Sequence, residues 1–140
     1  MTDHGPVRQM RIVVTAETAE DYDAALAFYR DTLGLPEQAA FSSPDGRVSI
    51  LEAGSATLEL ADPRHAEYVD EVEVGRRVAG HIRVCFEVVD APAVTATLAE
   101  AGATVVAEPT RTPWDSLNSR LEGPLDLHLT IFEELGDPAR

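Results

Sequence analysis

Apolar and polar residues alternate with a period of two in two segments of the chain, residues 10–14 and 81–90. In the second segment, four apolar residues share one face of a predicted strand and four polar or small residues share the other. The apolar set is Ile82, Val84, Phe86 and Val88, and the opposite set is His81, Arg83, Cys85 and Glu87. The pattern predicts strands with one face on a core and the other face on the wall of a polar pocket.

Each strand is followed by a predicted helix. Thr18 with Asp21 resembles a capping box, and an apolar stripe then runs from Tyr22 to Leu33 before Gly34 ends the helix. In the second half Asp90 is a good N-cap, and residues 91–101 form a helical segment that closes at Gly102.

Three short strands follow each helix, so the order of elements is βαβββ twice. The predicted strands are 38–41, 48–51 and 57–60 in the first half, and 104–107, 118–121 and 127–132 in the second. The repeated order indicates an internal duplication. We predict modules at residues 7–61 and 81–135, separated by an acidic linker at 62–80 that carries a possible helical turn at 65–69.

The predicted fold class is therefore α+β, with two βαβββ modules. Neither half has enough apolar positions to be stable alone, so the modules should pair within the chain or across a dimer. Exposed strand edges also favour a homodimer, because an uncovered edge readily pairs with another chain.

The net charge of −14, from 11 basic and 25 acidic residues, argues against nucleic acid and anionic membranes as partners. It fits either a solvated acidic surface or attraction of a cationic ligand. Cys85 is the single cysteine, the first residues lack the pattern of an export signal, and no apolar run reaches membrane-spanning length. We expect a cytoplasmic protein.

Several segments together resemble the vicinal oxygen chelate superfamily, which includes glyoxalase I, bleomycin-resistance proteins and extradiol dioxygenases. They are residues 24–35, residues 86–90, and a C-terminal group of Trp114, Asn118, Gly123-Pro124 and residues 129–132. The resemblance implies that the modules form an open cup of mixed β-sheet around a small-molecule site, with helices packed outside. It also implies a homodimer.

In metal-using relatives, the ligands lie on the first and fourth strands of each module. The resemblance places Arg11, Glu59, Arg83 and Thr130 at these positions, and only Glu59 is a plausible ligand. We therefore expect no metal cofactor. The alternative is a site for zinc, nickel, iron or manganese made by His81, Glu59 and His128.

The predicted ligand-binding residues are Arg11, Glu59, Arg83, Cys85, Trp114, His128 and Thr130. For the arginines two hypotheses stay open. Either Glu59 and Glu87 neutralise both in an internal network, or one arginine keeps a fork of donors for a carboxylate or phosphate on a ligand. Trp114 either stacks on a ligand at the mouth of the cup or caps the core, and Cys85 is also a plausible small core residue.

Three functions follow from these observations. The leading hypothesis is a metal-independent protein that binds a small organic molecule, similar to bleomycin-resistance proteins. The second is a divalent-metal lyase or dioxygenase related to glyoxalase I. The third is an interaction module whose cup is filled by side chains.

Overall fold

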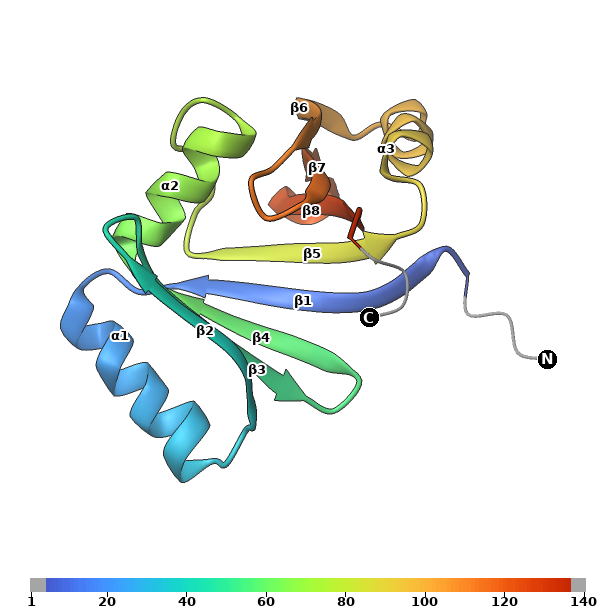
Figure 1. Cartoon of the computed structure of the whole chain (residues 1–140). Helices are drawn as coiled ribbons and strands as arrows, with labels where there is room; N and C mark the ends of the chain where they lie inside the picture. Colours follow the sequence, from blue (N-terminus) through green and yellow to red (C-terminus); the bar gives the residue numbers. More distant parts are fainter. Residues whose placement is uncertain (1–4, 137–140) are drawn as a thin grey trace.

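The computed structural model describes residues 5–136 and contains one eight-stranded mixed sheet with helices on both faces (Figure 1). Residues 1–4, on which part of the export-signal prediction rests, lie outside this range. The predicted α+β class and βαβββ order are confirmed. No helix in the described part of the chain is long and apolar enough to cross a membrane.

The first module contains four strands and a helix that begins as an α-helix and continues as a π-helix. It consists of β1 (Val7–Thr15), α1 (Ala19–Leu26), a π-helical continuation (Ala27–Thr32), β2 (Glu37–Ser43), β3 (Gly46–Ala53) and β4 (Ala56–Ala61). The capping prediction is confirmed, because the Thr18 side chain accepts a hydrogen bond from the backbone N–H of Asp21. Gly34 follows the helix with a φ of 87°.

The second module repeats this arrangement with a shorter helix. It consists of β5 (Ile82–Val88), α3 (Ala91–Glu100), β6 (Thr104–Arg111), β7 (Ser116–Gly123), a single 3-10 turn (Pro124–Asp126) and β8 (Leu127–Glu134). Asp90 caps α3 by accepting from the backbone N–H of Ala93, and Gly102 ends it with a φ of 113°.

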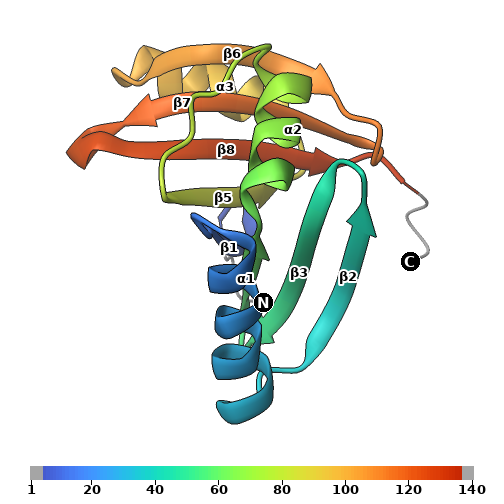
Figure 2. The same ribbon diagram turned by 90° about the vertical axis from the view of Figure 1, so that its left-hand side faces the viewer.

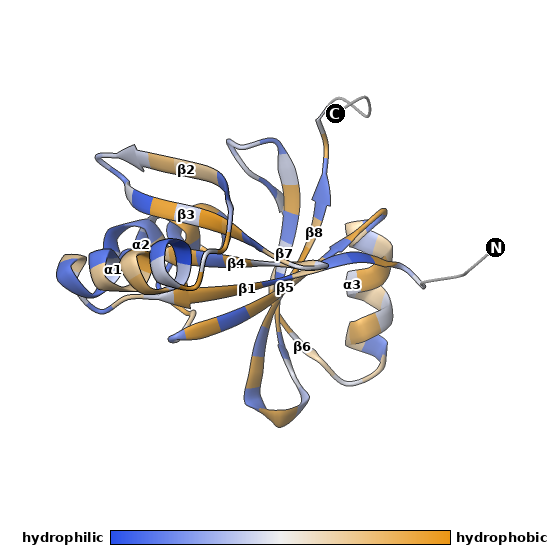
Figure 3. Ribbon diagram, turned by 90° about the horizontal axis from the view of Figure 1, so that it is seen from below, coloured by the Kyte–Doolittle hydropathy of each residue, from blue (hydrophilic) through white to orange (hydrophobic). Residues whose placement is uncertain are grey.

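The two modules join within the chain through β1 and β5, which pair antiparallel. The strand order β2-β3-β4-β1-β5-β8-β7-β6 places equivalent strands of each module at equivalent distances from this junction. The sheet curves into a cup, and apolar and polar residues alternate along its strands (Figure 3). The cup is therefore formed by a single chain.

Two helices pack on the outer face of the sheet, as predicted. Tyr22 and Leu26 of α1 pack on Leu51 and Leu60, and the Tyr22 hydroxyl lies 2.9 Å from the hydroxyl of Ser49. Ala91 of α3 belongs to a second core, whose other buried members are Val88, Leu121 and Ile131. Each module therefore has its own small apolar core, and the opposite face of the sheet is left to the cup.

The predicted linker contains a third helix, α2 (Pro63–Glu73), far longer than the single turn that the sequence indicated. Asp62 caps it by accepting from the backbone N–H of His65, and Pro63 occupies its first turn. Helix α2 lies on the inner side of the cup and contacts β3 and β4 of one module and β6 and β7 of the other (Figure 2). The segment is thus a wall of the cup.

The turn between β2 and β3 contacts the beginning of α2 closely, and this contact predicts a mutational effect. Gly46 has a φ of 107°, and a Cβ at this position would collide with the backbone of His65 and the carboxylate of Asp62. We expect Gly46→Ala to lower the free energy of unfolding by about 2–4 kcal/mol, from backbone strain and displacement of α2. Chemical denaturation measures the effect.

Gly54→Ala is the matched control, since Gly54 also has a positive φ, of 68°, but nothing within 4 Å of the added Cβ. It should cost about 1 kcal/mol. Equal losses in the two variants would mean that the turn does not position α2.

Candidate functional site

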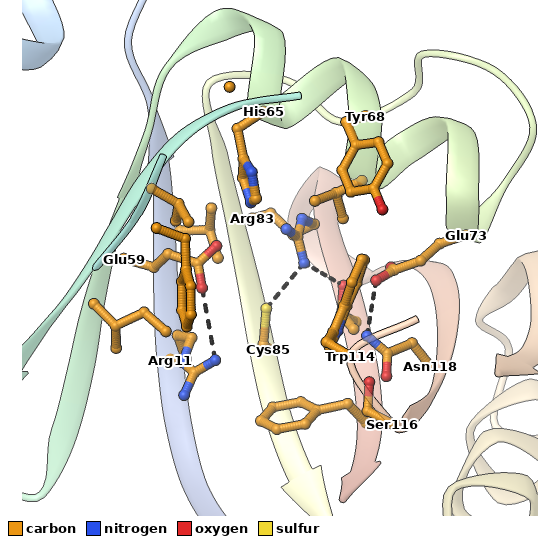
Figure 4. A pocket seen from close by; sticks show the side chains of 18 of the residues that line it. Arg11, Glu59, His65, Tyr68, Glu73, Arg83, Cys85, Trp114, Ser116 and Asn118 are labelled. Carbon is orange, nitrogen blue, oxygen red and sulfur yellow. Dashed lines mark hydrogen bonds and ion pairs between the residues drawn. The ribbon is translucent and has the colours of Figure 1, made fainter. Parts of the chain in front are cut away.

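A cavity of about 350 Å³ lies on the concave face of the sheet, between α2 and the strands of both modules. Its floor carries the polar face of β1 and β5, and α2 forms one side (Figure 4). Much of the wall is apolar, including Val13, Val48, Ile50, Val69 and Phe132. Such a space is of the size that small organic ligands occupy.

Arg11 and Glu59 face each other in this cavity from neighbouring strands. Arg11 Nη1 lies 3.6 Å from Glu59 Oε1, and Arg11 Nε donates to Thr57 Oγ1 at 2.9 Å. The guanidinium also lies 5.5 Å from the ring centroid of Phe132. Arg11 is therefore held by protein groups on several sides, which agrees with the internal-network hypothesis for this arginine.

Arg83 has a different environment. It is 8% exposed, and its Nη1 donates to Thr130 Oγ1 at 2.7 Å and to Cys85 Sγ at 3.1 Å, both of them uncharged acceptors. Burial lowers the pKa of Arg83, but electrostatic attraction to Cys85 and to the more distant carboxylates of Glu73 and Glu59 outweighs burial and raises it, so the side chain is a cation at neutral pH.

Glu87 does not neutralise Arg83, contrary to the network hypothesis. The Glu87 carboxylate accepts from Gln9 Nε2 at 2.8 Å and lies 3.9 Å from Arg8 Nε. The structure therefore separates the two arginines that the sequence treats alike: Arg11 has a carboxylate partner and Arg83 lacks one among residues 5–136.

A buried ion cluster joins α2 to the second module. Arg120, which is fully buried, lies 2.8 Å from Asp70 Oδ1 through Nη1 and donates through Nε to Glu73 Oε1 at 2.7 Å. Asn118 donates to the other oxygen of Glu73 at 2.8 Å, and Arg77 lies 2.6 Å from Asp70. Both carboxylates of α2 that face inward are thus occupied by protein groups.

Asp70 is also bonded to the backbone after α2. Burial raises the pKa of its carboxyl, but hydrogen bonds from the N–H groups of Val78 and Ala79, together with Arg120 and Arg77, outweigh burial and lower the pKa to about 2. The carboxylate therefore stays ionised at physiological pH. It connects the end of α2 and the backbone of residues 78–79 to Arg120 on β7.

Aromatic and imidazole groups lie at the rim of the cavity. Tyr68 of α2 and Trp114 are 6.2 Å apart between ring centroids, and Trp114 is 42% exposed. This placement fits the hypothesis that Trp114 lies at the mouth of the cup. Burial lowers the pKa of His65, which also lines the cavity, so its imidazole is neutral at pH 7.

Cys85 lies in the cavity floor with Val13 and Phe132 and is 4% exposed. Burial raises the pKa of its thiol, more than the neighbouring Arg83 lowers it. The thiol is therefore protonated at neutral pH and serves as a small packing group that accepts a hydrogen bond from Arg83.

The two histidines of the alternative metal site do not join Glu59. His81 Nδ1 lies 3.0 Å from the carbonyl oxygen of Thr15, outside the cavity. His128 lies between Arg120, 3.1 Å from its Nε2, and Glu122, 2.6 Å from its Nδ1. Within residues 5–136, no group of three or more His, Cys, Asp or Glu side chains is arranged to hold a metal ion. The predicted set of His81, Glu59 and His128 is wrong as a cluster.

The four positions that the family resemblance assigns to metal ligands can be tested by their chemistry. Arg11, Glu59, Arg83 and Thr130 all line the cavity, as the resemblance implies. They supply two guanidinium groups, one hydroxyl that already accepts from Arg83, and one carboxylate beside Arg11. This donor set does not fit a divalent cation.

The predicted site contains no residue of α2, although this helix contributes His65, Tyr68, Val69 and Glu73 to the cavity. The signal available was Asp62 followed by Pro63, a common beginning for a helix. It was obscured because the buried stripe of α2 includes Asp70 and Glu73, which are acidic residues at positions where an amphipathic helix normally has apolar ones.

Comparison with known proteins gives a family and a fold. Residues 11–132 match the family model described as the glyoxalase/bleomycin resistance protein/dioxygenase superfamily. No curated protein matches the chain in sequence.

Solved structures with the same fold are distant in sequence. A hypothetical protein from Bacillus halodurans C-125 is 17% identical, with coverage of 91% of this chain and 94% of that one and a TM-score of 0.66. A superfamily member from Vibrio splendidus 12B01 is 11% identical, with coverage of 89% and 97% and a TM-score of 0.63. Methylmalonyl-CoA epimerase in complex with methylmalonyl-CoA and NH4+ is 20% identical, with coverage of 95% and 98% and a TM-score of 0.59. These likenesses establish the fold.

The ion cluster predicts a specific dependence of stability on acid. The folded-state pKa of Asp70 lies below the ordinary value of 3.8, so the folded protein binds this proton less readily than the unfolded chain does. The resulting stabilisation, about 2 kcal/mol, is present above pH 4 and should be lost as the pH falls from about 4 to 2. Denaturant unfolding at a series of pH values measures it.

Asp70→Asn should be less stable at pH 7 and should show a shallower loss over the same pH range. Asp23→Asn, which removes a carboxylate that is 63% exposed, is the control and should keep the acid dependence of the wild type. An unchanged pH profile in Asp70→Asn would contradict this role for the cluster.

Proposed function

The chain belongs to the glyoxalase/bleomycin resistance protein/dioxygenase superfamily, and we propose that it binds a small organic molecule in the cavity beneath α2, without a metal at the positions of Arg11, Glu59, Arg83 and Thr130. The observation that carries this proposal is the cavity itself. It combines about 350 Å³ of space, a largely apolar wall and a few polar groups directed inward.

The arrangement of the charged side chains supports binding without a metal. Glu59, the one acidic residue at these four positions, already has Arg11 as a counter-ion at 3.6 Å. A cation placed beside Glu59 would also lie near the guanidinium of Arg11, and the two positive charges would repel each other. The leading function therefore remains sequestration or recognition of an organic ligand.

An open cavity also weighs against the hypothesis of an interaction module with a filled cup. In such a module, large side chains would occupy the concave face. Here Cys85, Ser116 and Thr130 are among the residues of the floor, and they leave space above the sheet. The epimerase with this fold that was solved with methylmalonyl-CoA supports the use of such a cup for an organic ligand.

A thermal-shift screen of small organic molecules, run with and without EDTA, tests the proposed function. A compound that binds the folded state raises the melting temperature; at about 100 times its dissociation constant it adds about 2.7 kcal/mol of stability. We expect at least one compound to give equal shifts in the two conditions. A free protein that EDTA destabilises, or a ligand shift that EDTA removes, would instead favour the metal-dependent lyase or dioxygenase.

We also propose that the protein forms a homodimer. The terminal strands β2 and β6 end the sheet, and an open edge readily pairs with another chain. Large apolar side chains are exposed on the first module, including Phe28 (59%), Leu33 (61%) and Phe41 (63%). Light scattering at micromolar concentration should give twice the mass of 15.1 kDa, and a monomer mass would refute the dimer.

A further inference from the structure

Most charged side chains around the cavity have a partner of opposite charge. Arg11 lies beside Glu59, Arg64 lies 3.8 Å from Asp45, Arg120 contacts both Asp70 and Glu73, and Arg77 contacts Asp70. Arg83 remains, without a carboxylate within ion-pair distance among the described residues. A guanidinium that is 8% exposed and lacks a counter-ion is costly to bury, because water no longer solvates it fully.

The donors of Arg83 are only partly used. Its two hydrogen bonds within the described residues both leave from Nη1, one to Cys85 and one to Thr130. The N–H groups on Nε and Nη2 have no protein acceptor within residues 5–136. Neither nitrogen is completely shielded from solvent. In Figure 4 the guanidinium lies between His65 and Cys85. Because Arg83 lines the cavity, these donors are available to a ligand that occupies it.

We propose that the ligand is a small organic anion whose carboxylate is bound by the free edge of Arg83 and whose apolar body lies against Val13, Val48, Phe132 and Trp114. This inference rests on the proposed small-molecule function and specifies its ligand class. A planar guanidinium matches the two oxygens of a carboxylate, and such charge-assisted bonds are stronger than neutral ones. A single negative charge is favoured because Arg83 is the one cation here without a carboxylate partner among the described residues. The carboxylates that also line the cavity, those of Asp45, Glu59, Glu73 and Glu134, would repel a second negative charge.

The net charge of −14 favours a cation at long range, whereas the contacts inside the cavity favour an anion. At physiological ionic strength, charges separated by more than about 8 Å in solvent are largely screened from each other. A buried guanidinium in contact with the ligand is screened much less. We therefore expect the cavity, not the surface, to determine which ligand charge is preferred.

Three probes with the same two-ring body and different charge test the proposal on the wild-type protein. They are 2-naphthoate, neutral 2-naphthamide and the cation 2-naphthylmethylammonium, each titrated by calorimetry at pH 7 and physiological salt. The account predicts that 2-naphthoate binds about 10- to 100-fold more tightly than either of the others, the range expected for a hydrogen bond to a charged group.

Variants then assign the preference to one residue. Arg83→Gln should weaken 2-naphthoate by about 10- to 100-fold and leave 2-naphthamide nearly unchanged. Arg83→Lys should give an intermediate loss, since it keeps the charge but not the planar fork. Arg8→Gln removes the same charge from a side chain that is 66% exposed, outside the cavity, and should bind like the wild type.

Stability provides a separate check on the variant. Arg83→Gln leaves no carboxylate without its ion-pair partner, so the melting temperature of this variant should equal or exceed that of the wild type. An equal affinity of 2-naphthoate for Arg83→Gln and for the wild type would overturn the proposal. Tighter binding of 2-naphthylmethylammonium or 2-naphthamide would overturn the anion specificity and leave the small-molecule function standing. Failure of all three probes would count against both.

Discussion

The buried contact of Asp70 and Glu73 with Arg120 is the interaction on which the cavity depends. The two carboxylates come from α2 and the guanidinium comes from β7, so the contact fastens a helix that follows the first module onto the sheet of the second. Helix α2 would otherwise present two ionised groups to a protein interior. Fully desolvated acids are tolerated only with paired cations and hydrogen bonds, and both are present here.

This contact also determines which charges remain for a ligand. Asp70 and Glu73, the inward-facing acids of α2, form ion pairs with Arg120, and Glu59 forms one with Arg11. None of these carboxylates is within ion-pair distance of Arg83. A different pairing, with Glu73 directed to Arg83, would give a cavity without a free cation and leave Arg120 with Asp70 as its one carboxylate partner among the described residues. The selectivity that we infer for the cavity is therefore a consequence of how the fold fastens its third helix.

Much of the fold could be predicted from the sequence, because period-two strands and capped helices are local signals. Thr18 and Asp90 begin helices through side-chain caps, and Gly34 and Gly102 end them by adopting a positive φ, all independently of distant contacts. The positions of Arg11, Glu59, Arg83 and Thr130 on the cavity wall also followed from strand parity and the family resemblance.

The third helix and the pairing of charges could not be predicted in the same way. In α2 the buried stripe contains Asp70 and Glu73, and burial of an acid is intelligible only once Arg120 is known to lie opposite. Likewise Arg11 and Arg83 are the same residue type and lie on the same face of the sheet, so the sequence does not distinguish them. Only the conformations of their side chains place Arg11 beside a carboxylate and Arg83 beside a hydroxyl and a thiol.

Nuclear magnetic resonance of the arginine Nε–H groups tests this distribution of charges most directly, with signals assigned by Arg83→Lys and Arg120→Lys. The Nε–H of Arg120, bonded to Glu73 at 2.7 Å, should exchange slowly with solvent in the free protein, and that of Arg83 should exchange quickly. Addition of 2-naphthoate should shift and protect the Arg83 signal and leave that of Arg120 unchanged. An Arg83 signal that is already protected in the free protein, or that is indifferent to 2-naphthoate, would contradict the account.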